Sequence, residues 1–233
     1  MDNKLIEEIE NSYDIFLPKN CTSIICCRGV GFSKVLKPYG GDDTDHIEAM
    51  IISAIETSKL MQNFVMAYVQ SDKISFVLSN EDYEYSQAWF GNRILKLASV
   101  SASSVSINYT VLMSSYKNKL IRGIFDGKVF DLERKYLNDY LQSRIKSGYN
   151  NAISKIYRLN EGHTKDKSLT EMEVTLIEDN IEISNLFKYG TIIIKKDREI
   201  NRINVSDIFD DTEYIVSSIF DDIRKRKDLK VKQ

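Results

Sequence analysis

Residues 67–76 are Ala-Tyr-Val-Gln-Ser-Asp-Lys-Ile-Ser-Phe, and they decide the fold because two apolar runs meet here across a short polar segment. The flanking stretches 64–69 and 74–78 have the length and composition of β-strands. The segment 70–73 between them lacks the usual Asn-Gly signal, but its brevity and polarity predict a hairpin turn. The hairpin gives two neighbouring antiparallel strands from which the rest of the sheet can be placed.

The elements around this hairpin complete a known supersecondary unit. Segment 23–27 is a short apolar run stopped by glycines, which indicates a buried strand followed by a tight loop. Apolar residues recur at helical spacing along three further segments, 45–60, 85–113 and 132–157. Segment 124–130 is predicted to be a strand. The resulting order is β-α-β-β-α-β, the split βαβ or ferredoxin-like unit.

The C-terminal part is less regular. We expect a helix at 169–177, a strand at 191–195 with a possible partner at 198–205, and a helix at 213–226 that runs into a basic tail. The simplest interpretation of that tail is a solvated terminus, with an RNA contact as the alternative. The fold class is therefore α+β: a ferredoxin-like sheet with helical and C-terminal β extensions.

Composition bounds the function only broadly. The chain has 233 residues, 42% of them apolar and 28% charged, with a formal net charge of -2. That balance is typical of a globular domain and does not argue for nucleic acid on charge alone. The N-terminus lacks the apolar segment of a signal peptide, and no apolar run approaches the ~20 residues that span a bilayer. We expect a cytoplasmic protein that does not act at a membrane.

The cysteines and histidines carry no recognisable site pattern. Cys21, Cys26 and Cys27 are odd in number, and neighbouring Cys26 and Cys27 would point to opposite faces of a strand. We interpret them as reduced thiols in the core, with no spacing that suits zinc. His46 and His163 are expected at the surface, because no motif fixes a partner for either.

Several segments resemble, in order, the motifs of the tRNA-histidine guanylyltransferase family. The hairpin resembles A-Y-x-Q-S-D-E-x-S-F, and residues 28–34 followed by Lys37-Pro38 resemble D-G-R-x-F with its downstream K-P. The remaining matches are Arg93 and Lys96 with R-x-x-K, residues 125–129 with F-D-G-R-V, Asp139-Tyr140-Leu141 and Arg144 with D-Y-F-x-W-R-Q, Asn151 with H-I-N-N, and residues 187–191 with F-K-x-G-T. Together the matches cover most of the chain from residue 17 to 191.

This resemblance implies both an architecture and an activity. The family's sheet is similar to a polymerase palm, so residues 1–160 would be a palm-like nucleotidyltransferase domain and 161–233 a C-terminal extension packed on it. The family adds nucleotides to a tRNA 5′ end in the 3′-5′ direction, using nucleoside triphosphate and two Mg²⁺ ions. It is typically tetrameric, so a homo-oligomer is expected by resemblance.

The family's metal site is altered in this chain. By position, the metal ligands would be Arg28, the Gly29 carbonyl, Asp72 and Lys73. Mg²⁺ requires oxygen ligands, usually including one or two carboxylates, whereas arginine offers only hydrogen-bond donors. Only Asp72 and Gly29 remain as candidate metal ligands, and Asp72 keeps the family's catalytic position. Ordinary two-metal nucleotidyl transfer is therefore not expected, and the chain resembles a pseudoenzyme.

Three hypotheses remain open at this point. The first is a site that binds nucleoside triphosphate or tRNA without turnover. The second is an active 3′-5′ nucleotidyltransferase that recruits other carboxylates, for which Asp42, Asp43 and Asp45 are candidates. These aspartates would otherwise serve as an acidic helix N-terminus. The third is a protein-interaction scaffold that binds no nucleotide.

For the first hypothesis, we expect cationic side chains to take over the metals' role toward phosphate. Arg28 and Lys73 supply about +2 and Asp72 about -1, a net charge near that of the family's metal-loaded site. The alternatives are that both cations pair with Asp72 in a closed cluster, and that Arg93, Lys96 and Arg144 form only a solvated helix face. The candidate nucleotide-binding residues are Arg28, Gly29, Val30, Gly31, Phe32, Lys37, Ser71, Lys73, Arg93 and Lys96, and the candidate tRNA-binding residues are Arg144, Asn151 and Lys188.

Overall fold

The computed structural model describes residues 2–40, 43–80, 87–163, 166–196, 199–207, 212–214, 216–218 and 220. Within this part, one antiparallel sheet has the strand order β4-β1-β3-β2-β5-β6. The strands are β1 (Thr22–Gly29), β2 (Phe64–Gln70), β3 (Lys73–Ser79), β4 (Phe125–Leu132), β5 (Thr191–Lys196) and β6 (Glu199–Asn204). The predicted hairpin joins β2 to β3 through Ser71 and Asp72.

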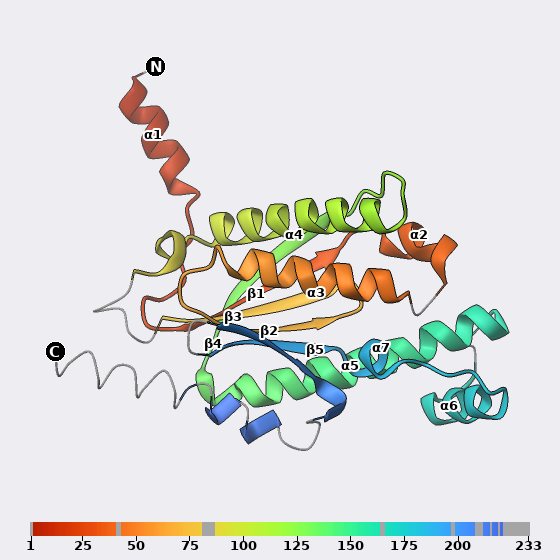
Figure 1. Ribbon diagram of the computed structural model, residues 1–233. Coiled ribbons are helices and arrows are strands. Elements are labelled where there is room, and N and C mark those ends of the chain that lie inside the picture. Colours follow the sequence, from red (N-terminus) through yellow and green to blue (C-terminus); the bar gives the residue numbers. More distant parts are fainter. Residues whose placement is uncertain are drawn as a thin grey trace.

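Helices cover both faces of the sheet. Helix α3 (Thr44–Ser58) connects β1 to β2, and α4 (Ile94–Tyr116) connects β3 to β4. Both lie on one face, while α5 (Leu137–Glu161) lies across the other, as Figure 1 shows. The predicted α+β class and the β-α-β-β-α-β order of the central elements are confirmed.

The alternation of side chains along β1 divides the interior into two cores. Ile25 and Cys27 point toward α3 and α4, where they join a large apolar cluster. Ile24 points the other way, into a second cluster formed with Leu141 and Ile145 of α5. Successive strand residues face opposite sides of a sheet, so a central strand covered on both faces carries an unbroken apolar run.

Two expectations from the sequence were wrong. The helix expected from residue 85 begins only at Ile94, because Phe90 (φ 50°) and Gly91 (φ 61°) take left-handed backbone angles in the 3-10 turn Trp89–Asn92 (η2). His46, expected at the surface, is fully buried, and its Nδ1 lies 2.8 Å from the Tyr109 hydroxyl. His46 is buried because α3 packs against α4, and a single histidine in the sequence gives no sign of that packing.

Shorter elements complete the chain. They are α1 (Asn3–Ser12), α2 (Phe32–Leu36), α6 (Leu169–Glu178), α7 (Asn185–Tyr189), and the 3-10 turns η1 (Lys37–Tyr39), η3 (Arg134–Tyr136) and η4 (Val205–Asp207). Helix α1 has no buried residue and stands away from the sheet (Figure 1). Helix α6 begins with a capping box between Ser168 and Glu171.

The C-terminal segment continues the central sheet. Strand β5 pairs with β2, and β6 pairs with β5, as predicted for the two late strands. Residues 212–214 and 216–218 are helical, whereas the basic tail 224–227 lies outside the described residues. The division of the chain at residue 160 stays a prediction. No helix in the described ranges is both long and apolar enough to cross a membrane.

Candidate functional site

The end of β1 at Arg28 and Gly29 and the β2–β3 turn lie side by side at one end of the sheet. The Gly29 N–H donates to the Asp72 carbonyl oxygen at 2.8 Å, and Arg28 pairs with Lys73 in the β1–β3 register. A side chain at Gly29 would put its Cβ 2.3 Å from the Phe32 ring, so only glycine lets the chain turn here. Arg28 and Asp72 are thus neighbours across β1 and the β2–β3 turn.

Two rows of side chains cross the sheet at this end, both on the face toward α5. The outer row is Asp126, Arg28, Lys73 and Gln70, each paired in register with the next. The inner row is Lys128, Cys26, Ser75 and Tyr68. Cross-strand neighbours on one face lie about 5 Å apart, so the rows form a continuous polar floor.

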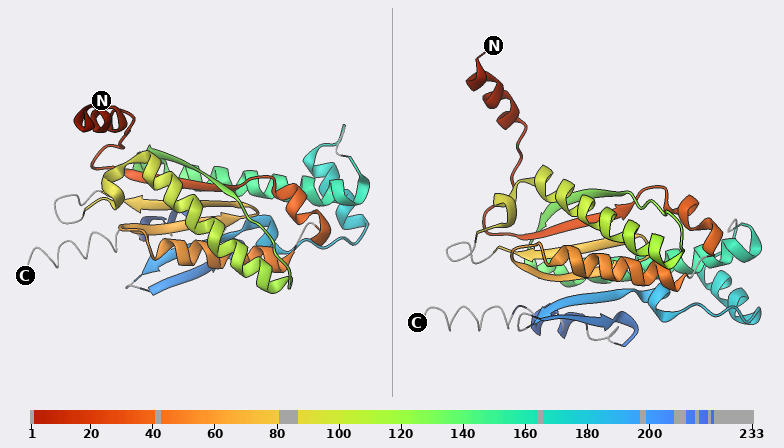
Figure 2. Two further views of the ribbon diagram at one scale, coloured as in Figure 1. Left: turned by 90° about the horizontal axis from the view of Figure 1, so that it is seen from above. Right: turned by 45° about the horizontal axis from the view of Figure 1, so that its top comes forward.

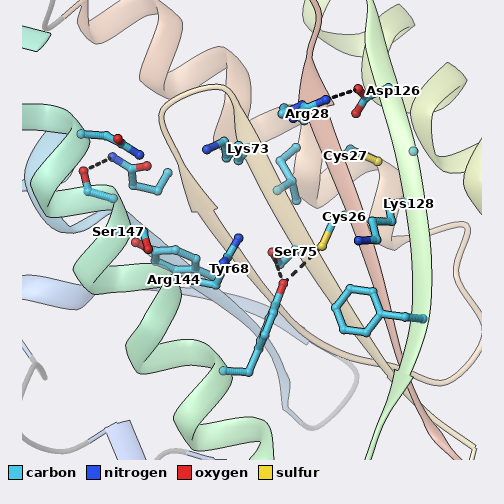
Figure 3. A pocket seen from close by; sticks show the side chains of 17 residues that line it. Cys26, Cys27, Arg28, Tyr68, Lys73, Ser75, Asp126, Lys128, Arg144 and Ser147 are labelled. Carbon is cyan, nitrogen blue, oxygen red and sulfur yellow. Dashed lines mark hydrogen bonds and ion pairs between the residues drawn. The ribbon is translucent and has the colours of Figure 1, made fainter.

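Helix α5 closes a cavity over this floor. The cavity has a volume of about 500 Å³, and its α5 wall consists of Tyr140, Arg144, Ser147, Gly148 and Asn151 (Figure 3). The helix approaches closely because Gly148 has no side chain, and a Cβ there would lie 2.7 Å from the Gln70 side chain. Gln70 Nε2 donates to the carbonyl oxygens of Gly148 (3.2 Å) and Phe187 (3.1 Å), which ties β2 to α5 and α7.

The cavity lining is strongly cationic. Four of its side chains are cations and one is a carboxylate, which leaves a net charge of about +3. Arg28 Nη2 donates to Asp126 Oδ2 at 2.8 Å, and both side chains are about half exposed. Within the described residues this is the one ion pair that involves a cavity cation, so Lys73, Lys128 and Arg144 are available to a ligand. The buried Arg144 Nε has no hydrogen-bond partner among the residues that the structure describes.

The inner end of the cavity is neutral and hydroxyl-rich. The Tyr140 hydroxyl lies 2.9 Å from Ser75 Oγ and 3.2 Å from Cys26 Sγ. Burial raises the pKa of Tyr140, so its hydroxyl stays protonated and can donate a hydrogen bond. The cavity therefore offers cations at its outer row and neutral donors further in.

The residues at the family's metal position do not fit Mg²⁺. Arg28 and Lys73 face each other in the β1–β3 register, at the two positions that the resemblance assigns to metal-binding carboxylates, and of that predicted set only Asp72 has a carboxylate side chain. Burial raises the pKa of Asp72, and the neighbouring Lys73 and Lys155 offset this only in part. Among the described residues, no three His, Cys, Asp or Glu side chains come together in a group that could hold a metal ion.

Asp43 and Asp45, considered above as replacement metal ligands, form other contacts in the structure. Asp43 caps α3 by accepting from the Asp45 N–H at 3.1 Å. Lys117 Nζ lies 3.0 Å from Asp43 and 2.8 Å from Asp45. The pair therefore serves the helix N-terminus and a half-buried lysine, as the structural alternative predicted. Asp42 lies outside the described residues.

The structure brings together part of the predicted set. The cavity between the sheet and α5 is lined by Arg28, Lys73, Arg144 and Asn151 together. The sequence analysis had assigned the first two to nucleotide and the last two to tRNA. Neither Arg28 nor Lys73 forms an ion pair with Asp72 among the described contacts, because Arg28 pairs with Asp126 instead. The closed-cluster alternative is therefore wrong for Arg28.

Other predicted residues lie outside the cavity lining. Arg93 pairs with Asp14 at 3.2 Å, Lys96 Nζ lies over the Phe90 ring, and Phe32 is a core residue. Lys188 lines a separate pocket beside α6. The remaining predicted residues that do not line the cavity are Gly29, Val30, Gly31, Lys37, Ser71 and Asp72.

Lys128 was missed as a site residue. The signal was present: Asp126 and Lys128 are two apart on one strand, so they share a face. What the sequence lacked was the register that puts Lys128 opposite Cys26 and Asp126 opposite Arg28.

Comparison with known proteins gives consistent matches. Residues 3–133, more than half of the chain, match the family model described as tRNAHis guanylyltransferase. A "Probable tRNA(His) guanylyltransferase" of Drosophila melanogaster is 28% identical over 207 residues, covering 78% of this chain and 70% of that protein.

Solved structures extend the similarity to the whole fold. A bacterial tRNA(His) guanylyltransferase-like protein in complex with ATP superposes with a TM-score of 0.84 at 25% identity, covering 93% of this chain and 98% of that one. The Saccharomyces cerevisiae tRNA(His) guanylyltransferase superposes with a TM-score of 0.71 at 18% identity, covering 87% of this chain and 95% of that one. The latter likeness concerns the fold alone.

Proposed function

We propose that this chain, which belongs to the tRNAHis guanylyltransferase family, binds the polyphosphate of a nucleoside triphosphate without a metal ion. The observation that carries the proposal is the charge of the cavity between the sheet and α5. Arg28 and Lys73 occupy the positions of two family carboxylates, and Lys128 and Arg144 add two further cations. A palm-like sheet would thus hold phosphate with side chains rather than with Mg²⁺.

The chemistry of these cations suits a polyphosphate. Arginine donates two parallel hydrogen bonds from a planar fork, and lysine acts as a compact point charge. The buried Arg144 Nε lacks a hydrogen-bond partner in the described part of the chain, and a phosphate oxygen would satisfy it. A volume of about 500 Å³ falls within the usual range of small-ligand pockets. The bacterial relative, whose structure contains ATP, supports a triphosphate as the ligand.

tRNA is the second proposed ligand. The resemblance assigned Arg144 and Asn151 to tRNA, and both line the cavity proposed for nucleotide. A terminal phosphate of RNA and a free triphosphate would then compete for the same cations. Competition between a tRNA and ATP in a filter-binding assay tests this part, and independent binding of the two would argue against a shared cavity.

Isothermal titration with ATP and GTP tests the central claim. We expect binding in EDTA to equal binding in Mg²⁺ within about twofold. The Arg28→Asp and Arg144→Ala substitutions should each weaken it at least ~tenfold, or about 1.4 kcal/mol. Lys146→Ala is the matched control, because Lys146 lies on α5 two residues from Arg144 and lines a different pocket.

The competing outcomes are distinct. Binding that requires Mg²⁺ and is lost in EDTA would contradict a metal-free site. Absence of binding would favour the scaffold hypothesis.

We also propose that Mg²⁺-dependent nucleotide addition is absent. The resemblance assigns three carboxylates to the metal site, and only Asp72 is present in this chain. The other two positions, on β1 and β3, hold Arg28 and Lys73. The test is incorporation of labelled nucleotide at a tRNA 5′ end. Incorporation abolished by Asp72→Ala would restore the hypothesis of an active transferase.

A further inference from the structure

The cations of the cavity between the sheet and α5 come from four different elements, on the sheet face opposite α3 and α4 (Figure 2). They are Arg28 of β1, Lys73 of β3, Lys128 of β4 and Arg144 of α5 (Figure 3). In the sheet register Arg28 lies directly opposite Lys73 and diagonal to Lys128. Such neighbours lie about 5 Å and about 7–8 Å apart, so the positive charge is spread along the cavity. A charge spread in this way matches an extended chain of phosphates better than a single phosphate.

Two of these cations lie over aromatic rings of the same lining. Lys128 Nζ lies 5.9 Å from the centroid of the Phe130 ring. The guanidinium carbon of Arg144 lies 5.5 Å from the centroid of the Tyr140 ring. The two rings pack edge to face, with their centroids 5.9 Å apart. A cation is attracted to the face of an aromatic ring, so this pair of rings positions Lys128 and Arg144 in the cavity.

The same contacts leave no free aromatic platform for a nucleobase. Tyr68, the third ring of the lining, is 5% exposed and donates its hydroxyl to the Tyr189 carbonyl oxygen at 2.8 Å. Among the described residues of the cavity, each aromatic side chain is therefore buried or already contacts a cation and another ring. Proteins commonly bind a base by stacking it on an aromatic side chain. A base that stacked here would have to displace Lys128 or Arg144.

The neutral polar groups that could read the edge of a base are engaged or exposed. Gln70 Nε2 donates to two backbone carbonyl oxygens, and Ser75 Oγ lies 2.9 Å from the Tyr140 hydroxyl. Ser147 and Asn151 are exposed on α5, where water competes for the same hydrogen bonds. Contacts to a base should therefore add little to the binding free energy.

We infer that the cavity recognises the linear triphosphate itself, so that inorganic tripolyphosphate and the common ribonucleoside triphosphates are equivalent ligands. This inference rests on the proposed function and adds the class of ligand to it: a polyphosphate chain, whatever organic group the chain carries. Each phosphate added to the chain gains charge-assisted hydrogen bonds from the four cations. The base and ribose contribute no comparable contact.

Isothermal titration in EDTA with a series of ligands tests the inference. ATP, GTP, CTP, UTP and inorganic tripolyphosphate should bind with affinities within about threefold of one another. AMP, ADP and ATP should differ by at least ~tenfold at each step, because each phosphate adds hydrogen bonds to charged groups.

The Lys128→Gln substitution separates contacts to phosphate from contacts to the base. It should weaken the binding of ATP and of tripolyphosphate by the same factor, about fivefold or more, because the lost cation contacts phosphate alone. Lys146→Gln is the matched control, since Lys146 is an exposed lysine of α5 that lines a different pocket. The control should leave both affinities unchanged, and circular dichroism establishes that both variants are folded.

The outcomes distinguish this inference from the proposed function. If none of the ligands binds, the proposed nucleotide site is wrong and the inference fails with it. If ATP binds but tripolyphosphate binds more than ~tenfold more weakly, the nucleotide site stands and the inference is overturned. A preference of more than ~tenfold for one base, or equal affinities for AMP and ATP, would overturn it in the same way.

Discussion

At the scale of single residues, Asp126 competes with any anionic ligand for Arg28. Its carboxylate holds the guanidinium at 2.8 Å in an exposed cross-strand pair. Exposed ion pairs contribute little to stability, about 0–1 kcal/mol, so a phosphate can displace the carboxylate at modest cost. The pair holds the Arg28 guanidinium against Asp126, and the Asp126 carboxylate lowers the net positive charge of the cavity lining.

Asp126→Asn should therefore tighten metal-free triphosphate binding. The change raises the charge of the lining from about +3 to about +4 and frees Arg28, so we expect a gain of roughly threefold to tenfold. Isothermal titration in EDTA measures it. Asp131→Asn removes a carboxylate from the same strand, outside the cavity lining, and should leave the affinity unchanged. Weaker binding by Asp126→Asn would show that the carboxylate positions Arg28 for the ligand.

His46 makes stability sensitive to acid. Burial, followed by the nearby Lys155, lowers its pKa to about 3, whereas an unfolded histidine titrates near 6.5. Between these values the unfolded chain binds a proton that the native state does not. Stability from this group is therefore complete above about pH 6.5 and is lost as pH falls toward 3, by up to ~1.4 kcal/mol per pH unit.

His46→Gln should remove this contribution. Urea unfolding at pH 4, 5 and 6 should give a shallower dependence for His46→Gln, by roughly 1 kcal/mol per pH unit. His163→Gln, at an exposed position, serves as the control and should follow the wild type. Parallel pH profiles for wild type and His46→Gln would mean that His46 is protonated in the native state.

At the scale of elements, glycines set how closely the helices approach the sheet. Gly148 admits α5 against Gln70, and Gly127 admits α4 against β4. At Gly127 a Cβ would lie 2.4 Å from the Ala98 carbonyl oxygen, which is backbone and cannot rotate away. The α4–β4 contact therefore depends on one missing side chain.

Gly127→Ala should shift α4 and destabilise the fold. Overpacking of a close contact typically costs about 1–3 kcal/mol, which urea unfolding measures directly. Asp131→Ala, an exposed change on the same strand, should stay within about 0.5 kcal/mol of wild type. Full stability for Gly127→Ala would mean that the strand bends away locally.

At the scale of the whole molecule, the C-terminal segment is built into the central sheet. Strand β5 hydrogen-bonds to β2, and Gln70 of β2 bonds the Phe187 carbonyl oxygen in α7. Ile192 and Ile193 of β5 point into the two different cores. A segment that shares both a sheet and both cores with the rest should not unfold on its own.

One cooperative transition is therefore expected in urea. Fluorescence of Trp89, the single tryptophan, reports the core beside α4, and amide hydrogen exchange of β5 reports the C-terminal segment. The two probes should give the same free energy of unfolding. Exchange of β5 at much lower free energy would instead support two separately stable parts divided near residue 160.

The sequence by itself determined the strands, the hairpin and the faces of their side chains. Strand alternation has a period of two residues, so Arg28 and Cys26 share a face whatever the rest of the chain does. The identities of residues 28 and 73 likewise determined that neither side chain brings a carboxylate to the sheet end, and a guanidinium cannot act as a metal ligand in any fold.

Tertiary structure alone decided which side chains meet. The β1–β4 register pairs Arg28 with Asp126, and the packing of α5 brings Arg144 over the same floor. The same long-range packing buries His46 beside Tyr109. It also places Arg93 in an ion pair with Asp14, outside the cavity. Periodicity is a property of neighbouring residues, whereas register and helix docking join positions far apart in the chain, such as Arg28 with Asp126 and His46 with Tyr109, and no local pattern encodes those contacts.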